Sequence, residues 1–197
     1  MKKFIIGAVV AFVLMMTVPG FAVDLTGIFG AGGFVGYAFG IGDTFDKVDF
    51  GNGSSMQNKL QFAFGGDLRY NFTPEMGVMG SVDYQTWKID FEGESAPSDE
   101  TEDWICVSGY FTYTLMLEGN TMPYGMVGPA IYIPSFDNAD TKLGFNAGAG
   151  VLHFFNTNMA LDAGLKVHYI PAFYEDGNST TALQPFVGFS YFFNSEI

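Results

Sequence analysis

The chain has 197 residues, a formal net charge of −13, and a composition that is apolar and aromatic for a soluble protein. Charged residues make up 15% of the chain and aromatic residues 17%, whereas soluble domains carry about 25% charged residues. A polyanion of this kind does not bind nucleic acid by neutralising phosphates. The single cysteine, Cys106, excludes a framework of intrachain disulfides.

The first residues predict a secretory signal peptide. Two lysines precede an apolar run at residues 4–18, and a small-x-small cleavage pattern ends at Ala22. The run is shorter than the ~20 residues of a membrane-spanning helix, and no cysteine lies near the cut to carry a lipid anchor. We therefore expect residues 1–22 to be removed and residues 23–197 to form one domain, with a net charge of −15 once the two lysines are lost.

The remaining chain predicts eight β-strands and no amphipathic helix. In each candidate, large apolar residues alternate with small or polar ones, and only a strand sorts residues with a period of two. The second candidate shows this clearly, because Phe62, Phe64 and Leu68 alternate with Asp67 and Arg69. The fifth is less regular, since Gly and Pro interrupt it. In chain order the candidates are residues 27–41, 60–72, 77–89, 104–117, 124–133, 143–155, 159–169 and 183–193.

The predicted connections alternate in length along the chain. This alternation indicates an up-and-down meander whose two ends meet different environments, and an even number of strands lets the sheet close and lose its edges. The tight connections are residues 73–75, 118–123 and 156–158, whereas the long polar ones are residues 42–59, 90–103, 134–142 and 171–181.

Residue size indicates which face of the sheet is the inner one. One face carries Phe, Tyr, Leu and Val, and the other mixes Gly, Ala, Ser, Thr and Asn with a few charges. Bulky residues would overfill an eight-stranded interior, and a continuous apolar exterior requires lipid as its solvent. The predicted fold is therefore all-β, an eight-stranded antiparallel up-and-down transmembrane β-barrel.

Four segments carry a family resemblance. Residues 188–193 read Gly-Phe-Ser-Tyr-Phe-Phe and fit the G-x-x-Y-x-F pattern of a terminal barrel strand, and family-like segments also occur at residues 123–128, 144–151 and 161–166. In this ordered set the chain resembles the small OmpA/OmpX-type outer-membrane barrels, the outer-membrane protein beta-barrel domain family.

The resemblance implies a location in the cell outer membrane, contact with its lipid, and a monomeric state. It also implies that the barrel-assembly machinery reads an assembly signal in the last strand. Four residues follow the aromatic residue that usually ends such proteins. The residues that carry this implied signal are Gly188, Tyr191 and Phe193.

Six ionisable residues fall on the predicted inner face. The hairpin register places Asp67 opposite Ser81, with Asp83 on the diagonal near Arg69. Because an unpaired buried charge is costly, we expect a structural network of ion pairs that fills the lumen, with a narrow gated pore as the alternative. The six residues are Asp67, Arg69, Asp83, Asp162, Lys166 and His168.

The two histidines do not predict an active site. His153 and His168 lie on opposite faces of the expected sheet, and His168 faces Asn146 and not a serine or a carboxylate. No nucleophile, base and acid therefore come together. We expect no catalytic residue, no cofactor site and no enzyme activity.

One predicted long loop is strongly acidic and is bracketed by Trp87 and Trp104. The two tryptophans fit an aromatic girdle at the outer interface. The carboxylates lack the regular spacing of a calcium-binding loop, so we expect a solvated acidic loop, with divalent cations as the alternative. The acidic residues are Asp90, Glu92, Glu94, Asp99, Glu100, Glu102 and Asp103.

Together these features predict an integral outer-membrane barrel with a filled polar lumen. Its expected role is structural, or involves surface contacts through acidic extracellular loops. A soluble periplasmic barrel of lipocalin type, which binds an apolar ligand inside, is the alternative from another class. It requires the bulky face to point inward.

Overall fold

A computed structural model describes the chain at residues 24–41, 48–49, 55–92, 100–117, 119–135, 140–171 and 179–193. Only the backbone is described at residues 48–49, 55–61, 87–92 and 100–102. The expected signal peptide and the four residues after Phe193 lie outside the described residues. In the described part of the chain, no helix combines the length and the apolar character needed to cross a membrane.

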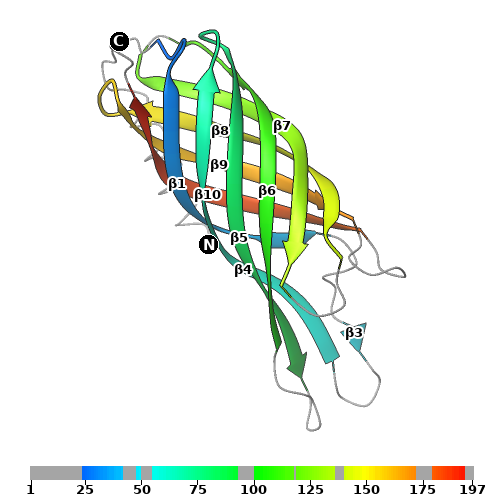
Figure 1. Cartoon of the computed structure of the whole chain (residues 1–197). Helices are drawn as coiled ribbons and strands as arrows, with labels where there is room; N and C mark the ends of the chain where they lie inside the picture. Colours follow the sequence, from blue (N-terminus) through cyan, green and yellow to red (C-terminus); the bar gives the residue numbers. More distant parts are fainter. Residues whose placement is uncertain are drawn as a thin grey trace.

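The structure is a single antiparallel sheet that closes on itself (Figure 1). β2 continues β1 after Ala38, and β3 is a two-residue strand beside β4, so eight strands form the wall. The strands are β1 (Phe29–Tyr37), β2 (Phe39–Ile41), β3 (Val48–Asp49), β4 (Ser55–Asn71), β5 (Met76–Glu92), β6 (Glu100–Thr114), β7 (Thr121–Pro134), β8 (Lys142–Phe154), β9 (Met159–Ile170) and β10 (Thr180–Phe193).

Pairing of the first strand with two partners closes the barrel. Phe29 lies opposite Phe193 of β10 on one side and opposite Tyr70 of β4 on the other. From β4 to β10, every strand pairs with the next one along the chain, and all these pairs are antiparallel. The predicted eight-stranded up-and-down barrel is confirmed.

The bulky face of the sheet points outward, as predicted. Phe29, Leu68 and Leu143 are 62%, 67% and 69% exposed, although all three are large and apolar. Since water-exposed apolar surface of this extent would cause aggregation, lipid is its natural solvent. The lipocalin alternative, which needs these side chains inside, is wrong.

The lumen nevertheless holds more aromatic side chains than the residue-size argument predicts. Phe34, Tyr124 and Phe154 are inside the barrel and at most 6% exposed. Glycines on the inner face make room for them. A Cβ atom at Gly150 would lie 2.7 Å from the Tyr124 ring, and one at Gly188 would lie 2.7 Å from Phe34.

β4, β5 and β6 are longer than predicted at the end of the barrel with the long connections, and β10 also begins before its predicted start, at Thr180. β4 begins at Ser55 and β5 ends at Glu92, and the two pair up to that point. β6 begins at Glu100. The expected loops at 42–59 and 90–103 are therefore partly strand, and these strands project beyond the rest of the barrel in the lower part of Figure 1.

The fifth candidate, which Gly and Pro interrupt, forms β7. Pro129 lies opposite Phe145 of β8. On the other side, the β6–β7 pairing is broken between Ser108–Ala130 and Phe111–Val127. Proline has no N–H to donate to a ladder, which accounts for a local break that leaves the register on either side unchanged.

Candidate functional site

The six ionisable residues predicted for the lumen all lie on its inner face. Asp67 is the most exposed of them, at 9%. They come from β4, β5 and β9, whose inward positions alternate with outward apolar residues. Three carboxylates therefore share the lumen with one arginine, one lysine and one histidine.

Arg69 joins two carboxylates across the lumen. Its Nη2 atom lies 2.6 Å from Asp162 Oδ2 and 3.1 Å from Asp67 Oδ1. The other Asp162 oxygen accepts a hydrogen bond of 2.8 Å from the Tyr124 hydroxyl. The guanidinium also lies over the rings of Tyr124 and Phe192, at 5.4 and 5.9 Å. These contacts connect β4 with β7, β9 and β10.

Lys166 forms the second ion pair, closer to the end with the long connections. Its Nζ atom lies 2.7 Å from Asp83 Oδ1, and both side chains are at most 2% exposed. Ser81 donates to the other Asp83 oxygen at 2.9 Å. The ammonium group also lies 3.8 Å from the centre of the Phe34 ring. Asp67 does lie opposite Ser81, but the carboxylate of Asp83 bonds to Lys166 and not to Arg69.

Uncharged polar side chains surround His168, which is fully buried. Its Nε2 atom lies 2.7 Å from Gln184 Oε1, and its Nδ1 atom lies 3.1 Å from the Tyr132 hydroxyl. Gln85 donates to the same Gln184 oxygen at 3.0 Å. The Tyr132 hydroxyl donates to Asn146. These five side chains form a hydrogen-bonded layer across the lumen. We call the layer the amide group, and it consists of His168, Gln184, Gln85, Tyr132 and Asn146.

Asn146 extends the amide group toward β6. It donates to Ser108 Oγ at 2.9 Å and to the Tyr110 hydroxyl at 3.3 Å, and its Nδ2 atom lies 3.6 Å from Cys106 Sγ. Three buried polar atoms of the lumen have no hydrogen-bond partner among the described residues, namely Gln85 Oε1, Gln184 Nε2 and Ser190 Oγ. The middle of the lumen is thus polar. Most of its described polar groups are hydrogen-bonded, and a few of their atoms are not.

An apolar plug fills the lumen at the end with the short turns. The rings of Phe154 and Phe192 pack with centroids 5.1 Å apart. Leu25 inserts beside them because a tight turn folds the chain there, with Ile28 N–H donating to the Leu25 carbonyl at 3.0 Å and Gly27 at φ 73°. Each member is at most 2% exposed. We define the plug as Leu25, Met122, Leu152, Phe154 and Phe192.

Trp104 lies inside the barrel, so its predicted place in an outer aromatic girdle is wrong. It is fully buried and packs edge-on against Tyr132, at 6.4 Å and 81°. Strand alternation gives the reason. Trp104 shares its face with Cys106, while Ile105 between them is 41% exposed. The side chain of Trp87 lies outside the described residues.

The described contacts of the two histidines do not make up a catalytic triad. Both ring nitrogens of His168 contact uncharged groups. His153 projects from the opposite face of β8, where its Nδ1 lies 2.9 Å from Thr121 Oγ1. In the part of the chain that the structure describes, no group of three or more His, Cys, Asp or Glu residues could hold a metal ion.

The proposed assembly-signal residues lie on the last strand. Tyr191 and Phe193 project outward and are 46% and 51% exposed. Gly188 is on the inner face, where a Cβ atom would lie 2.3 Å from the Gly33 carbonyl oxygen. The first two are therefore accessible from the membrane, and the glycine allows β10 to approach β1.

A family model named outer membrane protein beta-barrel domain matches residues 8–193. The chain belongs to this family. The match spans all eight strands of the wall and agrees with the outward apolar face, so the protein resides in the outer membrane. No curated protein matches the sequence.

Solved structures of outer-membrane proteins share the fold at low sequence identity. OprG from Pseudomonas aeruginosa is 16% identical with a TM-score of 0.62, covering 90% of this chain and all of OprG. Neisserial surface protein A is 17% identical with a TM-score of 0.54, covering 84% of this chain and 97% of that protein. Ail from Yersinia pestis is 18% identical with a TM-score of 0.51, covering 85% and 99%. At this identity the likeness shows the fold alone.

Proposed function

We propose that this protein is a closed, non-conducting outer-membrane barrel with a structural or surface-contact role. The observation that supports this most is the pair of ionic bridges across the lumen, Arg69 to Asp162 and Lys166 to Asp83. Each links strands that are not neighbours in the wall. A barrel of eight strands has an interior just wide enough for side chains to fill, and here these side chains are paired.

Closure does not depend on the ion pairs alone. The apolar plug occupies the lumen near the short turns, and Trp104, Tyr132 and Ile170 are fully buried near the other end. A hydrated ion would have to pass two apolar constrictions and a layer of fixed charges. We therefore expect no open path under resting conditions.

Planar-bilayer recording of the refolded protein tests the proposal. The wild type is expected to give a silent trace, and Arg69→Ala and Lys166→Ala are expected to stay silent because the apolar constrictions remain. Lys142→Ala is the matched control, since it breaks an ion pair of 3.2 Å whose carboxylate is 81% exposed. Steady single-channel currents in the wild type would contradict a closed barrel.

A narrow gated pore is the second candidate. The unpartnered atoms of Gln85, Gln184 and Ser190 favour it, because they leave polar groups along the lumen that are not committed to one another. In this case Arg69→Ala or Lys166→Ala would produce currents that wild type and Lys142→Ala lack. Unchanged silence in all four proteins would exclude the gate.

The long strands support the surface-contact part of the proposal. β4 and β5 have 17 residues each and β6 has 15, whereas β8 and β9 have 13 and 12. Because short turns face the periplasm in such barrels, the extra length projects to the cell exterior. The extended parts of β5 and β6 include Asp90, Glu92, Glu100 and Glu102.

The acidic end is proposed to make contacts by charge, and a divalent cation is one candidate partner. Calcium titration of refolded protein by calorimetry tests the cation. Binding that persists in wild type and is lost in a variant with Asp90, Glu92, Glu100 and Glu102 changed to Asn or Gln would support it. The absence of heat would leave macromolecular contacts as the role of this end. We propose no enzymatic function, since His153 hydrogen-bonds a threonine hydroxyl and His168 hydrogen-bonds a tyrosine hydroxyl and an amide, without a carboxylate among these partners.

A further inference from the structure

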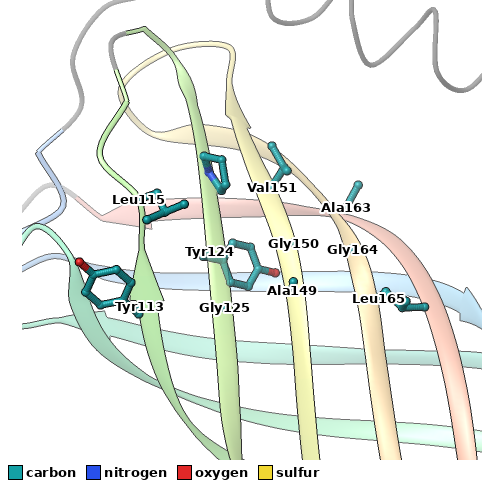
Figure 2. Close-up of a pocket in the computed structure, with 11 residues that line it drawn as sticks. Tyr113, Leu115, Tyr124, Gly125, Ala149, Gly150, Val151, Ala163, Gly164 and Leu165 are labelled. Carbon is teal, nitrogen blue, oxygen red and sulfur yellow. The ribbon is translucent and has the colours of Figure 1, made fainter.

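The outer wall of the barrel has a hollow of about 710 Å³ across β6–β9 (Figure 2). Gly125 and Ala149 form its floor, and larger side chains stand around it. Ligand pockets are usually about 300–1,000 Å³, so the hollow is large enough for part of a small amphiphile. Its outward lining residues include Leu115, Pro123, Val151, Ala163 and Leu165.

The hollow exists because neighbouring strands place small residues side by side on the outer face. Gly125 lies opposite Ala149, Ala149 lies opposite Leu165, and Val151 lies opposite Ala163. A Cβ atom at Gly125 would meet no atom closer than 4.0 Å. The space above this glycine is therefore open to the membrane, and the protein itself does not fill it.

A polar pair marks one end of the hollow. Thr121 and His153 are paired across β7 and β8 and lie one outward position nearer the short turns than Pro123 and Val151. Their side chains meet at 2.9 Å between Thr121 Oγ1 and His153 Nδ1. The pair lies toward the short turn at residues 155–158, which is the periplasmic end of the barrel. Beyond the apolar lining the wall thus carries hydrogen-bonding groups, of which His153 is 8% exposed and packs against the outward ring of Phe155 at 5.7 Å.

We propose that this hollow binds one glycerophospholipid of the periplasmic leaflet, with an acyl chain against Gly125 and Ala149 and the headgroup region at Thr121 and His153. The order of apolar floor and polar end matches an amphiphile that lies along the barrel wall. A second copy of the barrel fits less well. It would present a broad convex face of bulky side chains, such as those 40–69% exposed elsewhere on the wall, to a narrow concavity.

Filling the hollow tests the proposal. Wild type, Gly125→Leu and Gly33→Leu would be extracted from membranes in mild detergent, and phospholipid retained per protein would be measured by native mass spectrometry. Gly33→Leu is the matched control, because Gly33 is an outward glycine whose added Cβ would meet only the Gly65 carbonyl at 3.8 Å, and it lies outside the hollow. We expect about a tenfold loss of retained phospholipid in Gly125→Leu, equivalent to about 1.4 kcal/mol, and none in Gly33→Leu.

A second variant keeps the test decisive if Gly125→Leu does not fold. Ala149→Leu fills the same floor from the neighbouring strand and should give the same loss. Folding of each variant is checked by heat-modifiable migration on a gel. Equal retention in all folded variants, a wild type without bound phospholipid, retention of lipopolysaccharide alone, or a dimer that Gly125→Leu dissociates would each overturn the proposal.

The polar end is tested separately by Thr121→Val, which keeps the shape of the side chain and removes its hydroxyl. Retention is expected to fall about fivefold, the value of one hydrogen bond of about 1 kcal/mol. Thr114→Val is not a suitable control, because Thr114 is buried. Thr86→Val is suitable, since Thr86 is a partly exposed threonine on a strand outside the hollow. Equal loss in both threonine variants would show that the polar pair does not anchor the lipid.

Discussion

In the half of the lumen near the short turns, Leu25, Phe154 and Phe192 fill the barrel by apolar packing. In the middle of the lumen, Arg69 and Lys166 fill it together with their carboxylate partners. The apolar plug depends on volume. Each methylene removed from the plug lowers the free energy of unfolding by an amount that grows with the cavity left behind. The ionic layer depends on partners, because a buried charge that loses its counter-ion cannot relax into packing. The same lumen is therefore filled by two kinds of interaction, which respond differently to the loss of a side chain.

The largest effect on stability is expected for Arg69→Ala. The substitution leaves Asp67 and Asp162 facing each other without a cation, so we expect a loss of about 5 kcal/mol in the free energy of unfolding. Urea unfolding of the protein in detergent micelles measures it. Replacing Arg69 with Lys keeps the charge and should recover part of the loss. A loss below about 1 kcal/mol in Arg69→Ala would show that the ionic layer does not hold the lumen.

Truncation of the plug should cost slightly less. Phe154→Ala removes a fully buried ring that packs on Phe192, and a loss of about 4 kcal/mol is expected. The adjacent Phe155 projects outward and is 55% exposed, so Phe155→Ala is the matched control with a smaller effect. Equal losses in the two variants, measured by the same unfolding curves, would mean that the plug is no more important than the lipid-facing wall.

The ionic layer should tolerate removal of both partners better than removal of one. Lys166→Met leaves Asp83 buried and unpaired, with an expected loss of about 3 kcal/mol, whereas Lys166→Met combined with Asp83→Asn is expected within about 1 kcal/mol of the wild type. A double-mutant cycle on unfolding free energies gives the coupling. Additive losses would indicate that the two side chains do not act as a pair.

The smallest effect is expected at Asp24, just before the plug. Hydrogen bonds from the Thr26 side chain and backbone lower the pKa of this exposed carboxyl below 3.8. A lowered pKa means that the stabilisation is present at neutral pH and disappears as the pH falls through the folded-state pKa. Wild type and Asp24→Asn should differ slightly at pH 7 and converge in acid. A constant difference across the titration would contradict this.

The fold could be predicted from the sequence because alternation and loop length are local signals. The same alternation also determines that Trp104 faces inward with Cys106, so its assignment to an outer girdle gave more weight to residue type than to strand parity. Partner choice in the lumen was harder. Lys166 of β9 donates to Asp83 across the interior. The pairing of β4 with β5 does not indicate which residue of β9 lies opposite Asp83 across the lumen.

Other features of the candidate site lie beyond single-strand reasoning. The inner aromatic side chains fit because glycines such as Gly150 and Gly188 belong to neighbouring strands, and only the register brings them together. The extension of β4 and β5 was missed because most of its residues are polar, and only Met56 and Phe91 interrupt runs that are typical of loops. Backbone pairing of β4 with β5 nevertheless continues to Ser55 and Glu92.

The 17-residue strands β4 and β5 have a consequence for the view of this protein from outside the cell. About 9–11 tilted residues suffice to cross the hydrocarbon layer, which leaves roughly six residues, or about 20 Å of ribbon at about 3.4 Å per residue. The β4–β5 register shifts between Leu60 and Ala63, close to Phe62, where the pairing of β4 with β1 ends. In the proposed orientation, a molecule that approaches the cell from outside would thus meet this ribbon, flanked by β3 and β6, before it reached the rest of the rim.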